Sequence, residues 1–478
     1  MKFIAFYFAL QLLSRVLVSP NLELDEAEQV FLLQSIELGY GLQPPFYTWL
    51  QGFFFQVFGP SVFSLALLKN LLLFGVYASI YWTARQIFEQ KQALAIALGL
   101  AFFPQILWEA QRDLSHSVLL LFCIAASMGL IIKGLRQGFT GPVIVGLALC
   151  AAVGIQSKYS FSVYAMAMFF ALALQAENRS VFFSGPLPVA RLGLFALVFF
   201  VVIFPHGQWL LDNWQAVQAP LLSKVRLQHE QGVHHGLYSL FVACLGFVAF
   251  GLISIVLARI FRRGRSFERP LWAESDLQRR IKTLLGTYLG VLFLMLLVLV
   301  VFFDVREMKD RWLQPFLVML PLFVFLALPT LRSGLQRVWL WGGGFFMLTC
   351  LVLMPSRTFF AEKLGEPSRL NIPHMKLVAA IAKDFPGVEV ITLNHQHEAG
   401  HFVLFGKQNA RPWKIKLAPS QSQTFLRQYT FSIENAPTAT VVEDGMNATS
   451  VRPMTYQWDV FQTEQGLEVR RAAGYSRH

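Results

Sequence analysis

The stretch that decides the fold is residues 284–303, LLGTYLGVLFLMLLVLVVFF, which carries no charged side chain. A helix rises about 1.5 Å per residue, so this stretch is long enough to cross the roughly 30 Å hydrocarbon core of a bilayer. It lacks the alternation of a strand, and only helices and closed barrels satisfy their backbone inside lipid. The sequence therefore predicts a membrane-spanning helix here.

Comparable apolar runs recur along the first three quarters of the chain. The chain is 55% hydrophobic and only 14% charged, with a mean hydropathy of +0.50, which leaves too little charge for the surface of a soluble protein of 478 residues. The first run follows Met1-Lys2 and has no small-x-small cleavage site, so we expect an uncleaved helix. We predict an all-α polytopic membrane bundle of about eleven helices, at residues 3–18, 62–84, 92–108, 116–132, 141–157, 160–176, 191–206, 237–258, 284–303, 312–329 and 338–354.

The net charge of +12 fits membrane topology better than nucleic-acid binding, because the basic residues form no stripe with interleaved aromatics. With a cytoplasmic N-terminus, basic loops fall on the cytoplasmic side, as the positive-inside rule expects. Basic side chains in these loops include Lys2, Arg85, Lys91, Lys133, Arg136, Arg179, Arg191, Arg262, Arg263, Arg265, Arg269, Arg332 and Arg337. The external side then receives residues 19–61, 109–115, 157–160, 207–236, 304–311 and everything after 355.

The chain divides by composition into residues 1–355, the transmembrane domain, and residues 356–478, a mixed polar tail. An amphipathic stretch from Met375 to Asp384 precedes Pro386-Gly387 and an alternating segment at 388–393, which predicts a helix, a turn and a strand. We expect a small external α/β domain. Three tail histidines, His395, His397 and His401, lack the spacing of a zinc motif and are expected at the surface.

The first external loop carries the acidic pair Asp25-Glu26, a few residues after the first helix. A carboxylate at the membrane surface can accept a proton from an incoming hydroxyl or hold a divalent cation. An ordinary solvated cluster that caps a helix would have the same sequence. Spacing alone does not decide between these interpretations.

The order of a first helix, the pair Asp25-Glu26 and then Gln43-Pro44-Pro45-Phe46-Tyr47-Thr48-Trp49-Leu50 resembles the type C polytopic glycosyltransferases. The resemblance is to the bacterial branch related to protein O-mannosyltransferases and the lipid A aminoarabinose transferase, and its motifs cover roughly residues 1–160. It implies a helical bundle with surface helices in the first loop, set in a bacterial inner membrane with a periplasmic tail.

The resemblance also implies a polyprenyl-phosphate sugar donor and catalysis by Asp25, with Glu26 beside it. Gln43 and Tyr47 are then candidate sugar or acceptor contacts. Relatives often have Lys or His where this chain has Gln43, which leaves open which cation contacts the donor phosphate.

A short external turn at residues 109–115 holds more polar residues than a turn needs. Arg112 offers a planar fork for a phosphate, and Asp113 and the following His116 are candidates for sugar or acceptor contact. Snorkelling at the interface with an Arg-Asp ion pair would explain the same residues.

Further cations lie near the external face. Lys158 and Lys69 are candidate donor-phosphate ligands, although each could instead snorkel, and Tyr159 is a candidate sugar contact. In the loop at 304–311, Arg311 is a candidate phosphate ligand and Trp312 a candidate sugar or prenyl contact, with a plain aromatic belt as the alternative.

The sequence thus predicts transfer of a sugar from a polyprenyl-phosphate donor to a lipid, glycan or protein acceptor at the external face. Cations would stabilise the phosphate leaving group and Asp25 would act as the base. Asp25 and Asp113 are also candidate ligands for a divalent metal, Mg²⁺ or Mn²⁺. The alternatives are a transporter or flippase of lipid-linked sugars, for which no inverted repeats or polar midplane residues are evident, and a non-catalytic scaffold.

Overall fold

A computed structural model describes residues 1–183, 188–215, 217–218, 232–261, 275–361, 364, 368–409, 411, 413–417, 424–432, 455–463 and 466–471. The chain forms two compact units. Unit 1 contains residues 1–8, 37–47 and 71–349, and unit 2 contains residues 9–36, 48–70 and 350–478. The predicted boundary at residue 355 falls inside a helix, and the predicted division at that point stays a prediction.

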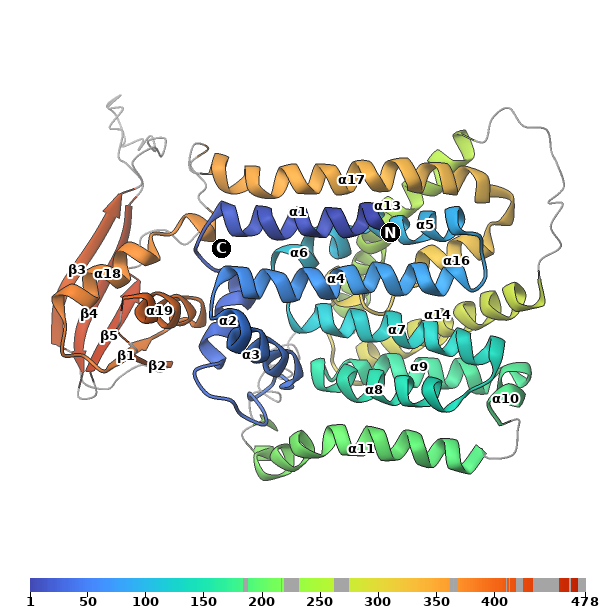
Figure 1. Cartoon of the computed structure of the whole chain (residues 1–478), viewed down its shortest axis with the longest axis horizontal. Helices are drawn as coiled ribbons and strands as arrows, with labels where there is room; N and C mark the ends of the chain where they lie inside the picture. The colour runs from blue at the N-terminus through green and yellow to red at the C-terminus, as the bar shows by residue number, and fades with distance from the viewer. Residues whose placement is uncertain are drawn as a thin grey trace. The chain divides into compact units, whose positions relative to one another are not determined.

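Unit 1 is helical, and its long helices lie side by side with roughly aligned axes (Figure 1). Its elements are α5 (Gln90–Leu98), η1 (Gly99–Phe102), η2 (Gln105–Glu109), α6 (Ala110–Arg112), α7 (His116–Gln137), α8 (Gly141–Ser157), α9 (Phe161–Ala173), α10 (Ala176–Phe183), α11 (Pro188–Asp212), α13 (Val233–Ile260), α14 (Asp276–Phe302), α15 (Asp310–Leu313), α16 (Leu320–Ala327) and η3 (Pro329–Leu331). Four helices contribute residues to both units: α1 (Lys2–Val18), α3 (Phe46–Phe58), α4 (Val62–Arg85) and α17 (Arg332–Ala361).

The predicted membrane bundle is confirmed, and each predicted span overlaps helix. Among the described residues, six helices are long and apolar enough to cross a membrane by length and composition, or seven if one bent pair counts as a span. Three further predicted spans are shorter helices, α1, α8 and α9, with 17, 17 and 13 residues. Arg262, Arg263, Arg265 and Arg269 of the predicted basic side lie outside the described residues, as do residues 219–231 of the fourth external segment.

Two of the eleven predicted spans are not single helices. In the span predicted at 92–108, the chain bends by 82° between Phe102 and Gln105, next to Pro104. In the span predicted at 312–329, α15 ends at Leu313 and α16 begins only at Leu320, with Pro321 in its first turn. Proline lacks the backbone N–H that a continuous helix requires, so hydropathy alone does not reveal the break within each of these spans.

Unit 2 combines most of the predicted first external loop with the tail. The loop contains the helices α2 (Leu24–Leu32) and α3 (Phe46–Phe58), as the resemblance implied. The tail contains η4 (Arg369–Asn371), α18 (His374–Asp384), β1 (Val390–Leu393), α19 (Gln396–Gln408), β2 (Lys414–Leu417), β3 (Thr424–Ser432), β4 (Thr455–Thr463) and β5 (Gly466–Arg471). The predicted helix, turn and strand near residue 386 are confirmed by α18 and β1.

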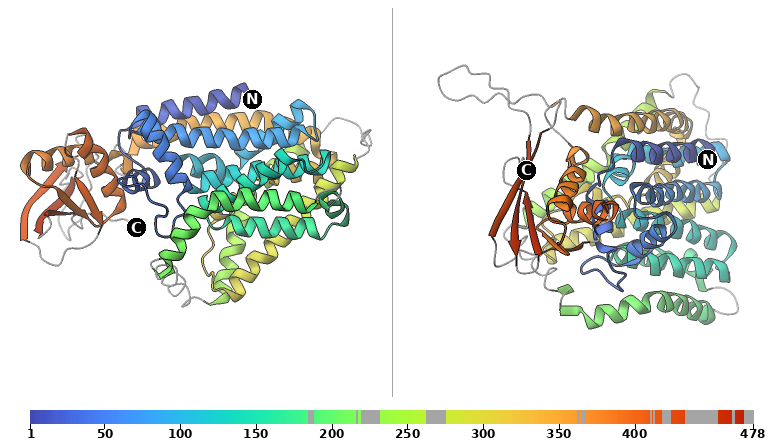
Figure 2. Two further views of the ribbon diagram at one scale, coloured as in Figure 1. Left: turned by 60° about the horizontal axis from the view of Figure 1, so that its bottom comes forward. Right: turned by 60° about the vertical axis from the view of Figure 1, so that its left-hand side comes forward.

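The tail sheet has the strand order β2-β1-β5-β4-β3. Strand β1 is parallel to β2 and β5, while β4 is antiparallel to both of its neighbours. Because β1, α19 and β2 follow one another and the strands are parallel neighbours, they form a βαβ unit, which requires a helix as the crossover. The strands appear together in both views of Figure 2.

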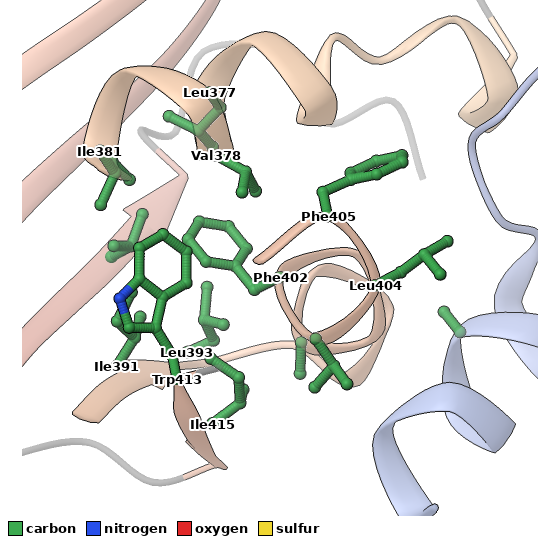
Figure 3. Packing of buried hydrophobic residues seen from close by; sticks show 14 of the residues in the cluster. Leu377, Val378, Ile381, Ile391, Leu393, Phe402, Leu404, Phe405, Trp413 and Ile415 are labelled. Atoms are coloured by element: carbon green, nitrogen blue, oxygen red, sulfur yellow. The ribbon is translucent and has the colours of Figure 1, made fainter. Parts of the chain in front are cut away.

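A hydrophobic core joins α18 and α19 to the sheet. Figure 3 shows side chains from α18, α19, β1 and β2 meeting there, and the cluster also includes Leu22 and Ala27 of the first loop. The periodicity of α18 explains its place, because Leu377, Val378 and Ile381 recur on one face and are fully buried. The first loop therefore shares a core with the tail.

Candidate functional site

Helix α2 carries the acidic pair, and a capping box fixes where this helix begins. The side chain of Glu23 accepts from the backbone of Glu26, and the Glu23 backbone N–H donates to Glu26 Oε2 at 2.9 Å. This reciprocal arrangement satisfies backbone donors that a helix N-terminus otherwise leaves unpaired. Asp25 lies between these two acids and is half-buried.

Glu26 is buried with two cations. Arg15 contacts both carboxylate oxygens, at 3.1 Å and 2.5 Å, and Lys69 Nζ lies 3.9 Å from Oε1. Burial alone would raise the pKa of Glu26, but the charges of Arg15 and Lys69 and the hydrogen bonds of Arg15 outweigh it and lower this pKa to about 2. A carboxylate with so low a pKa is a weak proton acceptor at neutral pH. Its contacts are those of a residue that anchors α2.

Glu23 is likewise surrounded by positive charge. Its carboxylate lies 3.6 Å from Arg357 and 3.9 Å from Arg369. With Arg15 and Lys69, four cations thus accompany two buried acids on either side of Asp25 in the sequence. The surplus of positive charge makes this end of α2 suitable for an anionic ligand such as a phosphate.

In unit 1, the polar turn begins at α6. Arg112 pairs with Asp113 at 2.6 Å and with Glu109 at 3.6 Å, so the ion pair considered from the sequence is present. The Asp113 side chain is buried, whereas that of Arg112 is one quarter exposed. The guanidinium can therefore still present donor groups to a ligand while the acids hold its orientation.

The predicted external segments of unit 1 come together. Lys158 Nζ donates to Ser117 Oγ at 3.0 Å, and the rings of Tyr47 and His116 lie 5.3 Å apart. The hydroxyl of Tyr159 is 2.9 Å from the ring of His206. Residues of the first and third predicted external segments thus contact the start of α7, directly after the second segment, and α11.

His206 is a residue that the sequence analysis missed. Its Nδ1 is 2.8 Å from the backbone oxygen of Leu38, and a carbonyl can only accept, so Nδ1 carries the proton. Its Nε2 must then accept from Tyr159, and Trp209 stacks on the other side of the ring. This arrangement fixes the direction of the Tyr159 hydroxyl. No signal in the sequence separates His206 from an ordinary helix residue.

The last predicted segment follows α14. Asp310 accepts from the side chain of Gln105 at 2.6 Å, which ties this loop to η2. Arg311 is half-buried and Trp312 is exposed, at 37%. Gln43 is half-buried and its backbone bonds to Tyr40. The roles of these three residues in binding stay predictions.

The candidate metal ligands do not form a group of three. In the described part of the chain, one cluster of three potential ligands has its ligand atoms within 4.8 Å of one another, and it consists of His374, His397 and His401. Asp113 is already neutralised by Arg112, and neither Asp113 nor Asp25 joins two further ligands. Mg²⁺ can bind through one or two carboxylates together with water and substrate phosphates, so a divalent metal at Asp25 or Asp113 stays a prediction.

The expectation of surface histidines in the tail is wrong for His401. His395 is exposed and His397 half-buried, but His401 is fully buried beside the buried His374. Sequence spacing could not show this, because His374 lies on a different helix from the other two. Arg357 and Arg369 were missed for the same reason, since nothing local links them to Glu23.

Comparisons with known proteins find relatives of this chain by family model and by sequence. Residues 42–209 match the family described as dolichyl-phosphate-mannose-protein mannosyltransferase. The lipopolysaccharide core galacturonosyltransferase RgtB of Rhizobium johnstonii is 37% identical over 331 residues, which cover 68% of this chain and 64% of that protein. RgtA of the same organism, also a lipopolysaccharide core galacturonosyltransferase, is 30% identical over 386 residues, which cover 77% of this chain and 73% of that protein.

Among solved structures, the chain is similar to ArnT from Cupriavidus metallidurans bound to undecaprenyl phosphate. It has a TM-score of 0.47 and 15% identity, and the match covers 86% of this chain and 77% of that one.

The chain spans less than two thirds of the length of RgtB but nearly three quarters of the length of RgtA. The chain belongs to the type C polytopic membrane glycosyltransferases, the family of the lipopolysaccharide core galacturonosyltransferases.

Proposed function

We propose that this protein transfers a sugar from a polyprenyl-phosphate donor to lipopolysaccharide at the external face of a bacterial inner membrane. The two curated relatives suggest a galacturonosyl unit as the sugar and the lipopolysaccharide core as the acceptor. The observation that carries the proposal is the asymmetry of α2. Glu23 and Glu26 are buried with cations, while Asp25 between them is half-buried.

In this mechanism Asp25 accepts the proton of the acceptor hydroxyl as that oxygen attacks the anomeric carbon. Glu26 does not act on the proton, because its low pKa makes it a weak base, and instead anchors the helix. Cations stabilise the charge that develops on the leaving phosphate. We assign this role to Lys69 in unit 2 and to Arg112, Lys158 and Arg311 in unit 1.

Sugar and acceptor contacts are assigned to a separate set of side chains. Tyr159 is the best supported of these, because the hydrogen bond to His206 orients its hydroxyl. The remaining candidates are Gln43, Tyr47, Asp113, His116 and Trp312. A transporter has no supporting observation, since both curated relatives are transferases.

A transfer assay tests the proposal. Purified protein in lipid vesicles is given a radiolabelled polyprenyl-phosphate galacturonate and lipopolysaccharide that lacks this sugar. We expect label in the lipopolysaccharide, and no label with Asp25→Asn. Glu28→Gln is the matched control, because it removes another half-buried carboxylate from the same helix. Movement of the donor across the membrane without labelled product would instead support the flippase.

A further inference from the structure

The chain just before α2 is held by the tail through side chains and backbone. Ser19 Oγ donates to the Leu370 oxygen at 2.8 Å, and Asn21 Nδ2 donates to the oxygens of Leu370 and Ile372 at 2.8 and 2.9 Å. After α2, the amide of Gln34 pairs with the backbone of Ile415 in β2, at 3.0 and 3.3 Å. Both ends of the α2 segment are therefore fixed to tail elements.

Two histidines of α19 bracket the peptide groups of Leu22, three residues before Asp25. The Leu22 N–H donates to His401 Nε2 at 2.8 Å, and His397 Nε2 lies 2.9 Å from the Leu22 oxygen. His401 Nδ1 lies 2.7 Å from the His397 oxygen and donates to it. Since one nitrogen of His401 must accept and the other must donate, only the neutral ring fits.

Close packing accompanies these hydrogen bonds. A Cβ at Gly400 would lie 2.3 Å from the backbone oxygen of Ala27, so α19 approaches the backbone of α2 more closely than any other residue would permit. Ala27 itself is fully buried. The position of α2 is thus set by α19 on the side opposite to solvent.

We propose that His397 and His401 are positioning residues that clamp Leu22, and through it hold α2 so that Asp25 is placed for proton transfer, and that protonation of the clamp releases it. The inference rests on the proposed role of Asp25 as the base. It gives the tail domain a function in catalysis without direct contact between the two histidines and the substrate.

Several charged or titratable groups face His401. They are His374 of α18, stacked on it with ring centroids 3.9 Å apart, His397 of the same helix, Glu26 of α2 and Arg15 of α1. Burial, chiefly, and the neighbouring His397 hold the pKa of His401 well below its ordinary value of 6.5. His374 behaves likewise, chiefly through burial and then through His401, His397 and Arg471.

The sign of the pH effect follows from this depression of the pKa. The histidines bind a proton less readily in the folded protein than in the unfolded chain. Their contribution to stability is therefore fully present above pH ~6.5 and declines as the pH falls below that value. A proton on Nε2 would also point at the N–H of Leu22, which removes the acceptor. Acid should therefore open the clamp.

A metal centre is the other arrangement that three close histidines suggest. Its geometry is unfavourable here, because the rings of His374 and His401 are stacked with an interplanar angle of 19°, so their lone pairs do not converge. Both nitrogens of His401 are already bonded to backbone groups. Neither ring nitrogen of His374 has a hydrogen-bond partner among the described residues, so His374 acts here as a flat packing surface.

The experiment compares His401→Gln with His401→Leu in the full-length protein in lipid vesicles. The Gln amide oxygen can replace Nε2 as the acceptor but does not titrate, whereas Leu offers no acceptor. For His401→Leu we expect kcat to fall about 10- to 100-fold at pH 7.5, with the donor KM changed less than about threefold. For His401→Gln we expect kcat near wild type and an acid limb of the pH profile displaced by about one unit to lower pH.

Two controls keep the outcomes distinct. His374→Phe keeps the stacked ring without its nitrogens, so the clamp predicts wild-type kcat, whereas a metal site predicts loss of activity together with sensitivity of the wild type to EDTA. Asp25→Asn tests the proposed function separately. If this variant is active, Asp25 is not the base, whatever the histidine variants show. Wild-type kcat and an unchanged pH profile in His401→Leu, with Asp25→Asn inactive, would overturn the clamp alone.

Discussion

Residues 23–26 and residues 109–113 both combine acids with arginine, but the arginines contact different acids. At α2 the cations pair with Glu23 and Glu26 on either side of Asp25. At α6 the cation Arg112 pairs with Asp113 itself, whose side chain is buried. The two segments therefore share a composition but differ in the ion pairs of their glutamates and aspartates. Under the proposed function, Asp25 would meet the acceptor hydroxyl, whereas Asp113 would orient Arg112.

The largest expected effect is on catalysis. Asp25→Asn should lower kcat at least about 10³-fold, because it removes the base, while Asp113→Asn should cost about 10- to 100-fold through a less ordered Arg112. Initial rates of sugar transfer at saturating acceptor measure both. Equal losses in the two variants would contradict the division of roles between the two segments.

The second effect is on stability. Glu26→Gln leaves the buried Lys69 and the half-buried Arg15 without their acid, so we expect a loss of about 3–5 kcal/mol in the free energy of unfolding around α2. Hydrogen exchange of the α2 backbone measures it. Glu28→Gln, on the same helix but half-buried, should change the same quantity by less than about 0.5 kcal/mol. A Glu26→Gln protein as stable as this control would show that Glu26 is not an anchor.

The stability of unit 2 should also depend on pH, through Glu26 and the buried histidines. The folded pKa of Glu26, about 2, lies below its ordinary value of 4.5, so the stabilisation is present above pH 4.5 and is lost as the pH falls towards 2. The shift corresponds to about 3 kcal/mol. We expect a first decline below pH ~6.5 from the buried histidines and a second below pH 4.5 from Glu26. Protection factors of the unit 2 amides, which correct for the intrinsic pH dependence of hydrogen exchange, measure both declines. Protection factors that stay constant from pH 7 to pH 3 would contradict both.

The smallest expected effect concerns packing. Gly400→Ala places a methyl group 2.3 Å from the Ala27 oxygen, so α19 and α2 must separate, at a cost of about 1–3 kcal/mol. Gly387→Ala is the control, because a Cβ there meets nothing within 4 Å. Thermal unfolding compares the two variants, and equal midpoints would show that α19 does not fix α2.

Much of the fold could be predicted from the sequence because the cause is local. A run such as 284–303 forms a helix wherever it lies, since lipid leaves its backbone no alternative. The same reasoning failed near Pro104 and Pro321, where hydropathy hides a missing N–H. The strands β3 to β5 lacked a local signal and were not predicted individually.

The candidate site was predicted only in part. The sequence placed Asp25 and Glu26 together in the first loop, and family resemblance implied a catalytic role. It could not separate the two, because Arg15 and Lys69, which bury Glu26, come from two other helices. The contacts of His397 and His401 with Leu22 could not be predicted for the same reason, since His401 is 379 residues away from Leu22 in sequence.

Donor binding and single-turnover transfer by Asp25→Asn in one vesicle preparation test the central claim most directly. If Asp25 is the base held in place by the tail, the variant should bind a fluorescent polyprenyl-phosphate galacturonate within about threefold of the wild-type Kd and form no product on the wild-type time scale. Product formation at the wild-type rate by this variant would contradict the account.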